Sequence, residues 1–249
     1  MEPVKEVFNY MIRIHNTVRK GSVDIWNAYM VSGAEFTEND IPICATTCHE
    51  VPRKLIGFDE AKAVYKKTVR KDHDFYEDAF VHFYIDDQKF DGKRSSIWLN
   101  PEIVVRFARH FAGVISPDFS VFQDFPKPIK MHNIYRMRAF DFWLELGNIP
   151  CIYNVRWGTE ETWEYCFDGI PKDSMISIGT VASDLRKPRS RTVFEDGFRK
   201  MIEILTPSTI VIYGSCESKV IREAENSGIT IISFPSKTAA AFKGSSGHE

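Results

Sequence analysis

The 249-residue chain is 43% hydrophobic, 13% aromatic and 27% charged, and its formal net charge is -2. These values exclude a disordered chain, and the near-neutral charge argues against a dedicated nucleic-acid coat, although a local basic patch is compatible with it. No apolar run approaches the roughly 18 residues of a membrane helix, and the N-terminus lacks the apolar core of a secretory signal. We therefore expect a soluble, cytoplasmic protein that does not enter a membrane.

The five cysteines do not form a disulfide framework, since their number is odd and most of them are far apart. Cys44, Cys48 and His49 lie close together in "CATTCHE", which raises the question of a metal site. A zinc finger needs a second Cys/His pair at matching spacing, and the sequence has none. Because free cysteine packs as a small hydrophobic residue, we expect these cysteines to be structural.

In chain order, the first 40 residues are predicted to form a helical cap, followed by a single α/β domain at 41–242 and a flexible tail at 243–249. Strands are predicted at short runs of β-branched, aromatic and other apolar residues, as in strands that are covered on both faces. These runs occupy residues 41–46, 55–58, 80–85, 113–118, 149–155, 175–181, 209–214 and 230–235.

Helices are predicted between most of these strands, over residues 59–71, 100–113, 133–147, 192–207 and 218–228. Alternating strands and helices indicate a parallel sheet with right-handed crossovers. Eight strands favour an irregular (β/α) barrel, with an open doubly wound sheet as the alternative. One defect is the segment "TCHEVPR" between the first two strands, which is too short for a crossover helix.

Acidic residues follow two of the predicted strands at their carboxyl ends, where active residues of parallel α/β folds lie. Asp118 ends the strand at 113–118, and Asp86 and Asp87 follow the strand at 80–85. Asp118 and Asp86 are candidate catalytic residues, because a carboxylate in this position can act as nucleophile or general base. All three acids are also candidate oxygen ligands of a divalent cation such as Mg²⁺. The alternatives are that Asp118 caps a helix or turn and that Asp86 and Asp87 form a solvated hairpin tip.

Two further segments at strand ends contain candidate ligand-binding residues. "NVRWG" supplies Asn154, Arg156 and Trp157, of which the guanidinium suits an anion and the indole suits a base. An internal salt bridge from Arg156 to a nearby aspartate is the alternative. "YGSCESK" supplies Gly214 and Ser215, whose turn leads into a helix and is able to bind a phosphate, or else forms an ordinary N-cap.

A basic stretch follows Asp118 at residues 127–138, and aromatic residues are interspersed with the basic residues around it. We expect the basic loop after Asp118 to lie over the carboxyl ends of the strands, and the stretch, which partly has helical spacing, to supply Lys130 and Arg136 as ligand-binding residues. Interleaved aromatic and basic residues favour contact with a nucleotide or single-stranded nucleic acid, although a solvated helix face gives a similar pattern.

Six segments carry a resemblance to a known family: "LIGFDEA", "AFVHFYIDDQKF", "VISPDFSVFQDFPKP", "NIYRMRAFDFWLELGNIPCIYNVRWG", "SMISIGT" and "IVIYGS". Over residues 55–234, their order resembles domain-of-unknown-function family 4417, which is found in bacteria and phages. The resemblance implies a phage, prophage or mobile-element context and supplies no activity or catalytic residues. "ISPDF" is also similar to a motif of the queuine-type tRNA base-exchange enzymes and their phage DNA-modifying relatives, whose cysteine zinc site this chain lacks.

These features leave three functions open. The first is a phage- or mobile-element-associated enzyme that acts on a nucleotide or nucleic-acid base, with Asp118 as the reactive acid and Arg156 as the anion-binding group. The second is a non-catalytic protein that sequesters a phosphorylated nucleotide, and the third is an interaction protein whose strand-end residues are structural. Acids near Arg156 favour chemistry, because a pocket that only sequesters anions should contain more basic than acidic groups.

Overall fold

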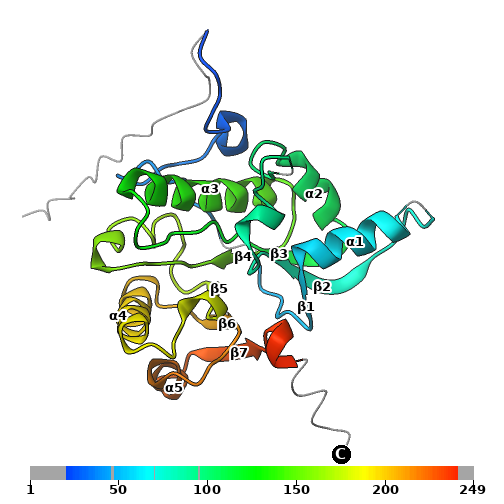
Figure 1. The fold of residues 1–249 in the computed structure, drawn as a ribbon. Coiled ribbons are helices and arrows are strands. Elements are labelled where there is room, and N and C mark those ends of the chain that lie inside the picture. The colour runs from blue at the N-terminus through cyan, green and yellow to red at the C-terminus, as the bar shows by residue number, and fades with distance from the viewer. Residues whose placement is uncertain (1–20, 46–47, 70, 95, 241–249) are drawn as a thin grey trace, which may run out of the picture.

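The computed structural model describes residues 21–45, 48–69, 71–94 and 96–240. Its centre is one sheet of seven parallel strands that lie in the order of the sequence and curl into a half-barrel (Figure 1). The strands are β1 (Leu55–Gly57), β2 (Glu77–His82), β3 (Phe111–Ile115), β4 (Cys151–Asn154), β5 (Met175–Gly179), β6 (Thr209–Tyr213) and β7 (Thr230–Phe234). The helices are α1 (Phe58–Thr68), α2 (Glu102–Ala108), α3 (Lys127–Leu146), α4 (Pro188–Leu205) and α5 (Lys219–Asn226).

The predicted α/β class with a barrel-like parallel sheet is confirmed. In a doubly wound sheet the strand order reverses at one point, whereas here each strand pairs with the next one along the chain. The barrel is incomplete, because β1 and β7 are the two edges of the sheet and do not pair with each other. An ion pair spans the opening, since Lys237 after β7 places its Nζ 2.6 Å from Glu60 Oε1 in α1.

The strand predicted at residues 41–46 is wrong. Of the described part of this segment, Pro42 makes a single antiparallel bridge to Phe36, and the remainder is irregular. Proline has no N–H to donate to a strand ladder, and the Cys44 N–H donates to the Gly169 carbonyl (2.9 Å) instead. Cys44 is buried in the core, so the segment has the apolar composition of a strand without being one.

The predicted cap at residues 1–40 is described only in its second half, and the predicted tail at 243–249 lies outside the described residues. The helical part of the described half is a short 3-10 turn, Ala28–Val31. The segment before this turn is held against α3 by the Tyr135 hydroxyl, which donates to the Trp26 carbonyl (3.0 Å). Across the described ranges, no helix combines the length and the apolar character needed to cross a membrane.

The sheet has two different faces, because successive side chains of a strand point to opposite sides. On one face, strand residues such as Val81 and Ile176 share a large core with helix residues such as Phe140 and Phe198. The concave face holds a smaller cluster to which no residue of the five α-helices belongs: Cys48, Phe80, Ala112, Ile115, Ile152, Met175 and Val211. The helices therefore cover the outer side of the half-barrel, and the strands fill its inner side with their own side chains.

Aromatic side chains occupy the concave face near the carboxyl ends of the strands. The rings of His82 and Tyr213 have centroids 4.2 Å apart, and Tyr84 stacks on Tyr213 at 5.5 Å. Gly179 makes room for Tyr84, since a Cβ at this position would lie 2.5 Å from the tyrosine ring. The Tyr84 hydroxyl lies 2.7 Å from Ser177 Oγ. This aromatic layer supports the polar residues at the strand ends.

A buried ion pair connects α3 to the ends of two strands. Arg138 and Asp141 are fully buried, and Nη1 of the arginine lies 3.0 Å from Oδ2 of the aspartate. Arg138 Nη2 donates to the backbone carbonyl of Asn154 at the end of β4 (2.5 Å), and Asp141 accepts a hydrogen bond from the Ser116 hydroxyl after β3. Burial raises the pKa of Asp141, because desolvation disfavours its charged form.

The basic loop expected over the strand ends is wrong, since residues 127–138 are the first half of α3, which begins at Lys127 and not at residue 133 as predicted. Pro128 lies in the first turn of the helix, where its missing N–H removes no hydrogen bond. Ile134 and Met137 are fully buried at helical spacing and pack in the core on the outer side of the sheet. The basic side chains in this stretch are therefore positioned by a helix.

We predict that Asp141→Asn lowers the free energy of unfolding by about 3–5 kcal/mol, because it leaves the Arg138 charge buried without its partner. The matched control is Asp196→Asn in α4, where Asp196 pairs with Arg199 (3.2 Å) at the same i,i+3 spacing but with both side chains 52% exposed. The control substitution should lower the free energy of unfolding by at most about 1 kcal/mol. Urea denaturation measures both losses, and equal losses would show that the buried pair has no special role.

A second prediction concerns His82, which is 2% exposed. Its pKa is lowered from 6.5 to about 4, mainly by burial; the nearby charge of Lys237 contributes in the same direction, and Asp59 acts in the opposite direction. The unfolded chain therefore binds a proton at a higher pH than the folded protein does. The stability that this histidine contributes is complete above pH 6.5 and is lost as the pH falls towards 4, by roughly 3 kcal/mol in total.

His82→Phe should remove this part of the pH dependence, because phenylalanine keeps an aromatic ring and does not titrate in this range. Chemical denaturation at a series of pH values measures it, with a substitution of the exposed His73, His73→Gln, as the control. A stability curve for His82→Phe that runs parallel to the wild-type curve between these pH values would contradict the prediction.

Candidate functional site

Asp118 is the centre of a hydrogen-bond network at the ends of β3 and β4. One carboxylate oxygen accepts a hydrogen bond from Asn154 Nδ2 (2.8 Å), and the other lies 2.5 Å from Arg156 Nη1. Oδ1 of the same asparagine, which is buried at the end of β4, lies 3.1 Å from the Tyr84 hydroxyl on the concave face. Burial alone would lower the pKa of Arg156, but the Asp118 carboxylate beside it raises the value overall. Each oxygen of Asp118 thus has one hydrogen-bonding partner within the network.

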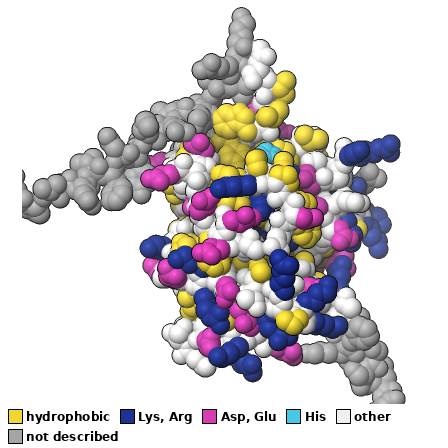
Figure 2. Space-filling view, turned by 60° about the vertical axis from the view of Figure 1, so that its left-hand side comes forward, with side chains coloured by type: hydrophobic (Ala, Val, Ile, Leu, Met, Phe, Trp, Pro, Cys, Tyr) yellow, Lys and Arg dark blue, Asp and Glu magenta, His cyan; other side chains and the backbone are white. Residues whose placement is uncertain are grey.

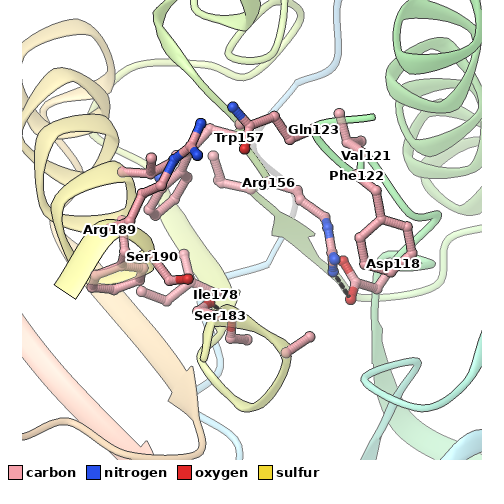
Figure 3. A pocket seen from close by; sticks show the side chains of 16 residues that line it. Asp118, Val121, Phe122, Gln123, Arg156, Trp157, Ile178, Ser183, Arg189 and Ser190 are labelled. Atoms are coloured by element: carbon pink, nitrogen blue, oxygen red, sulfur yellow. Dashed lines mark hydrogen bonds and ion pairs between the residues drawn. The ribbon is translucent and has the colours of Figure 1, made fainter. Parts of the chain in front are cut away.

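A pocket of about 270 Å³ opens beside this network (Figure 3). Its walls come from the loop after β3, the end of β4, the turn after β5 and the first turns of α4. We term it the Arg156 pocket. Its polar lining residues are Asp118, Gln123, Arg156, Ser183, Arg189 and Ser190.

Two aromatic residues, Phe122 and Trp157, line the pocket in different ways. Phe122 is 47% exposed, and its ring centre lies 5.9 Å from the guanidinium carbon of Arg156. Trp157 packs on Phe194 of α4, with ring centroids 5.5 Å apart. A Cβ at Gly197 would lie 2.1 Å from the indole, so helix and tryptophan are in close contact. Trp157 is therefore a wall of the pocket, whereas Phe122 offers an accessible ring.

Arg189 lies on the opposite side of the pocket from Asp118, in the first turn of α4 (Figure 3). Within the described residues, its side chain takes part in no ion pair. No acidic residue occupies the first turn of α4, so the positive end of the helix dipole is not neutralised there. Two guanidinium groups and the start of a long helix consequently border one small cavity.

Gly214 and Ser215 line a second and larger cavity of about 1130 Å³ at the carboxyl ends of β5, β6 and β7, which we term the β6–β7 groove. Gly214 has a φ of 121°, and a Cβ there would lie 2.4 Å from Thr180 Oγ1, so the position requires glycine. The Thr180 hydroxyl donates to the Ser215 carbonyl (2.9 Å) and fixes the turn. Because all strands are parallel, pocket and groove lie at the same edge of the sheet.

Lys130 and Arg136 lie in α3 and line neither cavity. Lys130 is 2% exposed, and its ammonium group pairs with Glu161. Arg136 pairs with Asp91 (2.5 Å), and its guanidinium carbon lies 3.8 Å from the centre of the Phe119 ring. Ligand binding by these two residues stays a prediction, and their charges already have acidic partners inside the protein.

The predicted acidic set does not come together. Asp87 accepts hydrogen bonds from the Ser120 N–H (3.1 Å) and hydroxyl (2.9 Å), and it thereby fixes the loop after β3. Asp86 is exposed before a 3-10 turn and makes no capping hydrogen bond. Among the residues that the structure describes, no three His, Cys, Asp or Glu side chains are grouped so that they could hold a metal ion.

Four of the residues predicted from the sequence line the Arg156 pocket or hold its ion pair in place: Asp118, Asn154, Arg156 and Trp157. Gln123 and Arg189 line the same pocket and were not predicted. The signal for Arg189 was present in "DLRKPRS", a basic segment that follows the strand β5. The first turn of the helix after a strand lies at the same edge of the sheet as the strand end, so Arg189 could be predicted by the same argument as Arg156.

Comparison with known proteins gives two curated relatives, both with the name "Gene 1 protein". The one from Mycobacterium phage L5 is 29% identical over 134 residues, which are 54% of this chain and 56% of the relative. The one from Mycobacterium phage D29 is 26% identical over 134 residues, 54% of this chain and 48% of the relative. The chain thus spans about half the length of these relatives.

No solved structure matches the chain, and the predicted likeness to queuine-type base-exchange enzymes is not shown by any of these comparisons. The family model described as "Domain of unknown function (DUF4417)" matches residues 36–235. This region is most of the 249 residues and contains every strand of the sheet. The resemblance inferred from the sequence is thereby confirmed, and the chain belongs to the DUF4417 family.

Proposed function

We propose that the Arg156 pocket binds a phosphorylated nucleotide. The observation that carries the proposal is that Arg156 and Arg189 border one cavity together with the accessible ring of Phe122. A guanidinium group binds phosphate oxygens through two parallel hydrogen bonds, and an aromatic ring stacks on a base. A volume of about 270 Å³ is near the lower limit of ligand pockets, which suits a single nucleotide unit.

The network around Asp118 favours binding as the first candidate function. A general base or nucleophile needs an oxygen directed at the substrate, whereas each oxygen of Asp118 already accepts a hydrogen bond, one from Asn154 and one from Arg156. The carboxylate instead holds the guanidinium group of Arg156 in place in the wall of the pocket. The similarity to phage proteins supports a phage-associated setting, in which such a protein would sequester a host nucleotide.

An enzyme acting on a nucleotide is the second candidate, because the ion pair lies at the edge of the pocket and not in the core. The side chains of Asp118 and Arg156 are 10% and 19% exposed. If a phosphate replaced Asp118 as the partner of the Arg156 guanidinium group, one oxygen of Asp118 would become free next to the bound ligand. The freed carboxylate would then be available as a base or nucleophile.

Isothermal titration calorimetry with AMP, GMP, CMP and UMP tests the proposal. We predict that at least one of these nucleotides binds the wild-type protein and that Arg156→Ala weakens its binding by roughly 2–5 kcal/mol, because it removes a charge-assisted pair of hydrogen bonds. Arg189→Ala should weaken binding at least about tenfold for the same reason. Arg199→Ala in the same helix, outside the pocket, is the control and should leave binding unchanged.

Two further variants separate binding from folding and from catalysis. Arg156→Lys keeps the charge next to Asp118 but loses the paired hydrogen bonds, so it should fold and bind weakly. Asp118→Asn removes the acid that competes with phosphate for Arg156 and should retain binding. If Asp118 is catalytic, this variant also loses nucleotide turnover in a product assay. A wild-type protein that binds none of the four nucleotides, or a folded Arg156→Lys variant with wild-type affinity, would contradict the proposal.

A further inference from the structure

The Arg156 pocket and the β6–β7 groove are the two sides of one ridge. The turn at residues 179–184 faces both cavities, since Ser183 lines the pocket and Val181 lines the groove. The start of α4 does the same, with Ser190 in the pocket and Arg191 in the groove. A ligand long enough to cross this ridge would therefore contact both cavities.

Three exposed arginines line the groove without an ion pair in the part of the chain that the structure describes: Arg186, Arg191 and Arg222. Arg191 donates from Nε to the Leu185 carbonyl (3.0 Å), which directs its side chain along the turn. The fourth basic residue of the groove, Lys219, lies 3.4 Å from Glu223. The side of the molecule that carries α4 and α5 shows many Lys and Arg side chains, interspersed with acids (Figure 2).

The acidic residues of the groove only partly offset these charges. Asp184 pairs with Lys187 (2.7 Å), so its charge is already balanced. Glu195 accepts a hydrogen bond from the Ser218 hydroxyl (3.0 Å) and has its carboxylate directed towards the start of α5. Glu217 is the remaining acid. The charge left for a ligand in the groove is positive, because three arginines face two acids, Glu195 and Glu217, that have no basic partner among the described residues.

We propose that the pocket and the groove together bind a single-stranded nucleic acid. One nucleotide occupies the Arg156 pocket, and the phosphodiester backbone crosses the ridge at Val181 into the groove, where Arg186 and Arg222 bind its phosphates. The proposal rests on the proposed function and extends the ligand from one nucleotide to a chain. The groove, at about 1130 Å³ against about 270 Å³ for the pocket, has room for the further nucleotides.

The arrangement has the two features that such a site needs. Proteins that bind single strands combine a basic groove along the backbone with aromatic side chains on which the bases stack. The arginines provide the first feature. Phe122 in the pocket, which is 47% exposed, provides the second, and Val181 on the ridge, which is 55% exposed, adds an apolar contact. Both side chains are apolar and accessible, and Phe122 lines the pocket whereas Val181 lines the groove.

Fluorescence anisotropy with short, fluorescein-labelled single strands of DNA and of RNA tests the inference, with AMP, GMP, CMP and UMP titrated in parallel by calorimetry. We expect the wild-type protein to bind at least one strand about tenfold or more tightly than any mononucleotide. The double variant Arg186→Ala, Arg222→Ala should lose this gain and keep its mononucleotide affinity. It should also lower the salt dependence of strand binding, by about 0.7 in the log–log slope for each phosphate that an arginine no longer neutralises.

Arg199→Ala is again the matched control, because it removes an exposed arginine of α4 that lines neither cavity. The inference is overturned if strands bind no more tightly than mononucleotides, or if the double variant behaves like Arg199→Ala. Retained mononucleotide binding would then leave the proposed function standing. Tight strand binding that depends on Arg186 and Arg222, without mononucleotide binding, would support the groove and contradict the mononucleotide proposal, and absence of both would overturn both.

Discussion

The buried pair of Arg138 and Asp141 is the interaction on which the rest of the site depends. Arg138 donates to the backbone carbonyl of Asn154, whose side chain binds Asp118, and Asp118 in turn holds Arg156. A continuous series of contacts therefore leads from the interior of α3 to the surface of the pocket. The charge at its start has no access to water, so breaking the pair is costly and the position of β4 relative to α3 is fixed.

The two faces of the half-barrel have different roles. Helices bury the outer face, and the aromatic layer around Tyr84 closes the inner face just below the strand ends. Polar groups at that edge consequently rest on a rigid support on one side and face solvent on the other. Asn154 is held in a fixed position by strand β4. Arg186 and Arg189 come from the turn and the helix after β5, where side chains can adjust to a ligand.

Most strands, and the edge of the sheet at which the candidate site lies, were predictable from the sequence, because buried parallel strands are recognisable as apolar runs and place the residues after them at one edge. Residues 41–46 were mistaken for a strand because a buried irregular segment has the same composition. The roles of Lys130 and Arg136 were harder to judge. Their partners, Glu161 and Asp91, are distant in the chain, and a basic stretch does not reveal whether its charges are already paired.

The cavity beside Arg156 is proposed to receive the phosphate of a nucleotide, and the other functional proposals depend on this step. The most direct test is a crystal structure of the full chain grown with a nucleotide that calorimetry shows to bind. We predict a phosphate within hydrogen-bond distance of Arg156 and Arg189, with the base against the ring of Phe122. A nucleotide bound elsewhere on the protein, with the ion pair between Asp118 and Arg156 intact and the pocket filled by water, would contradict this prediction.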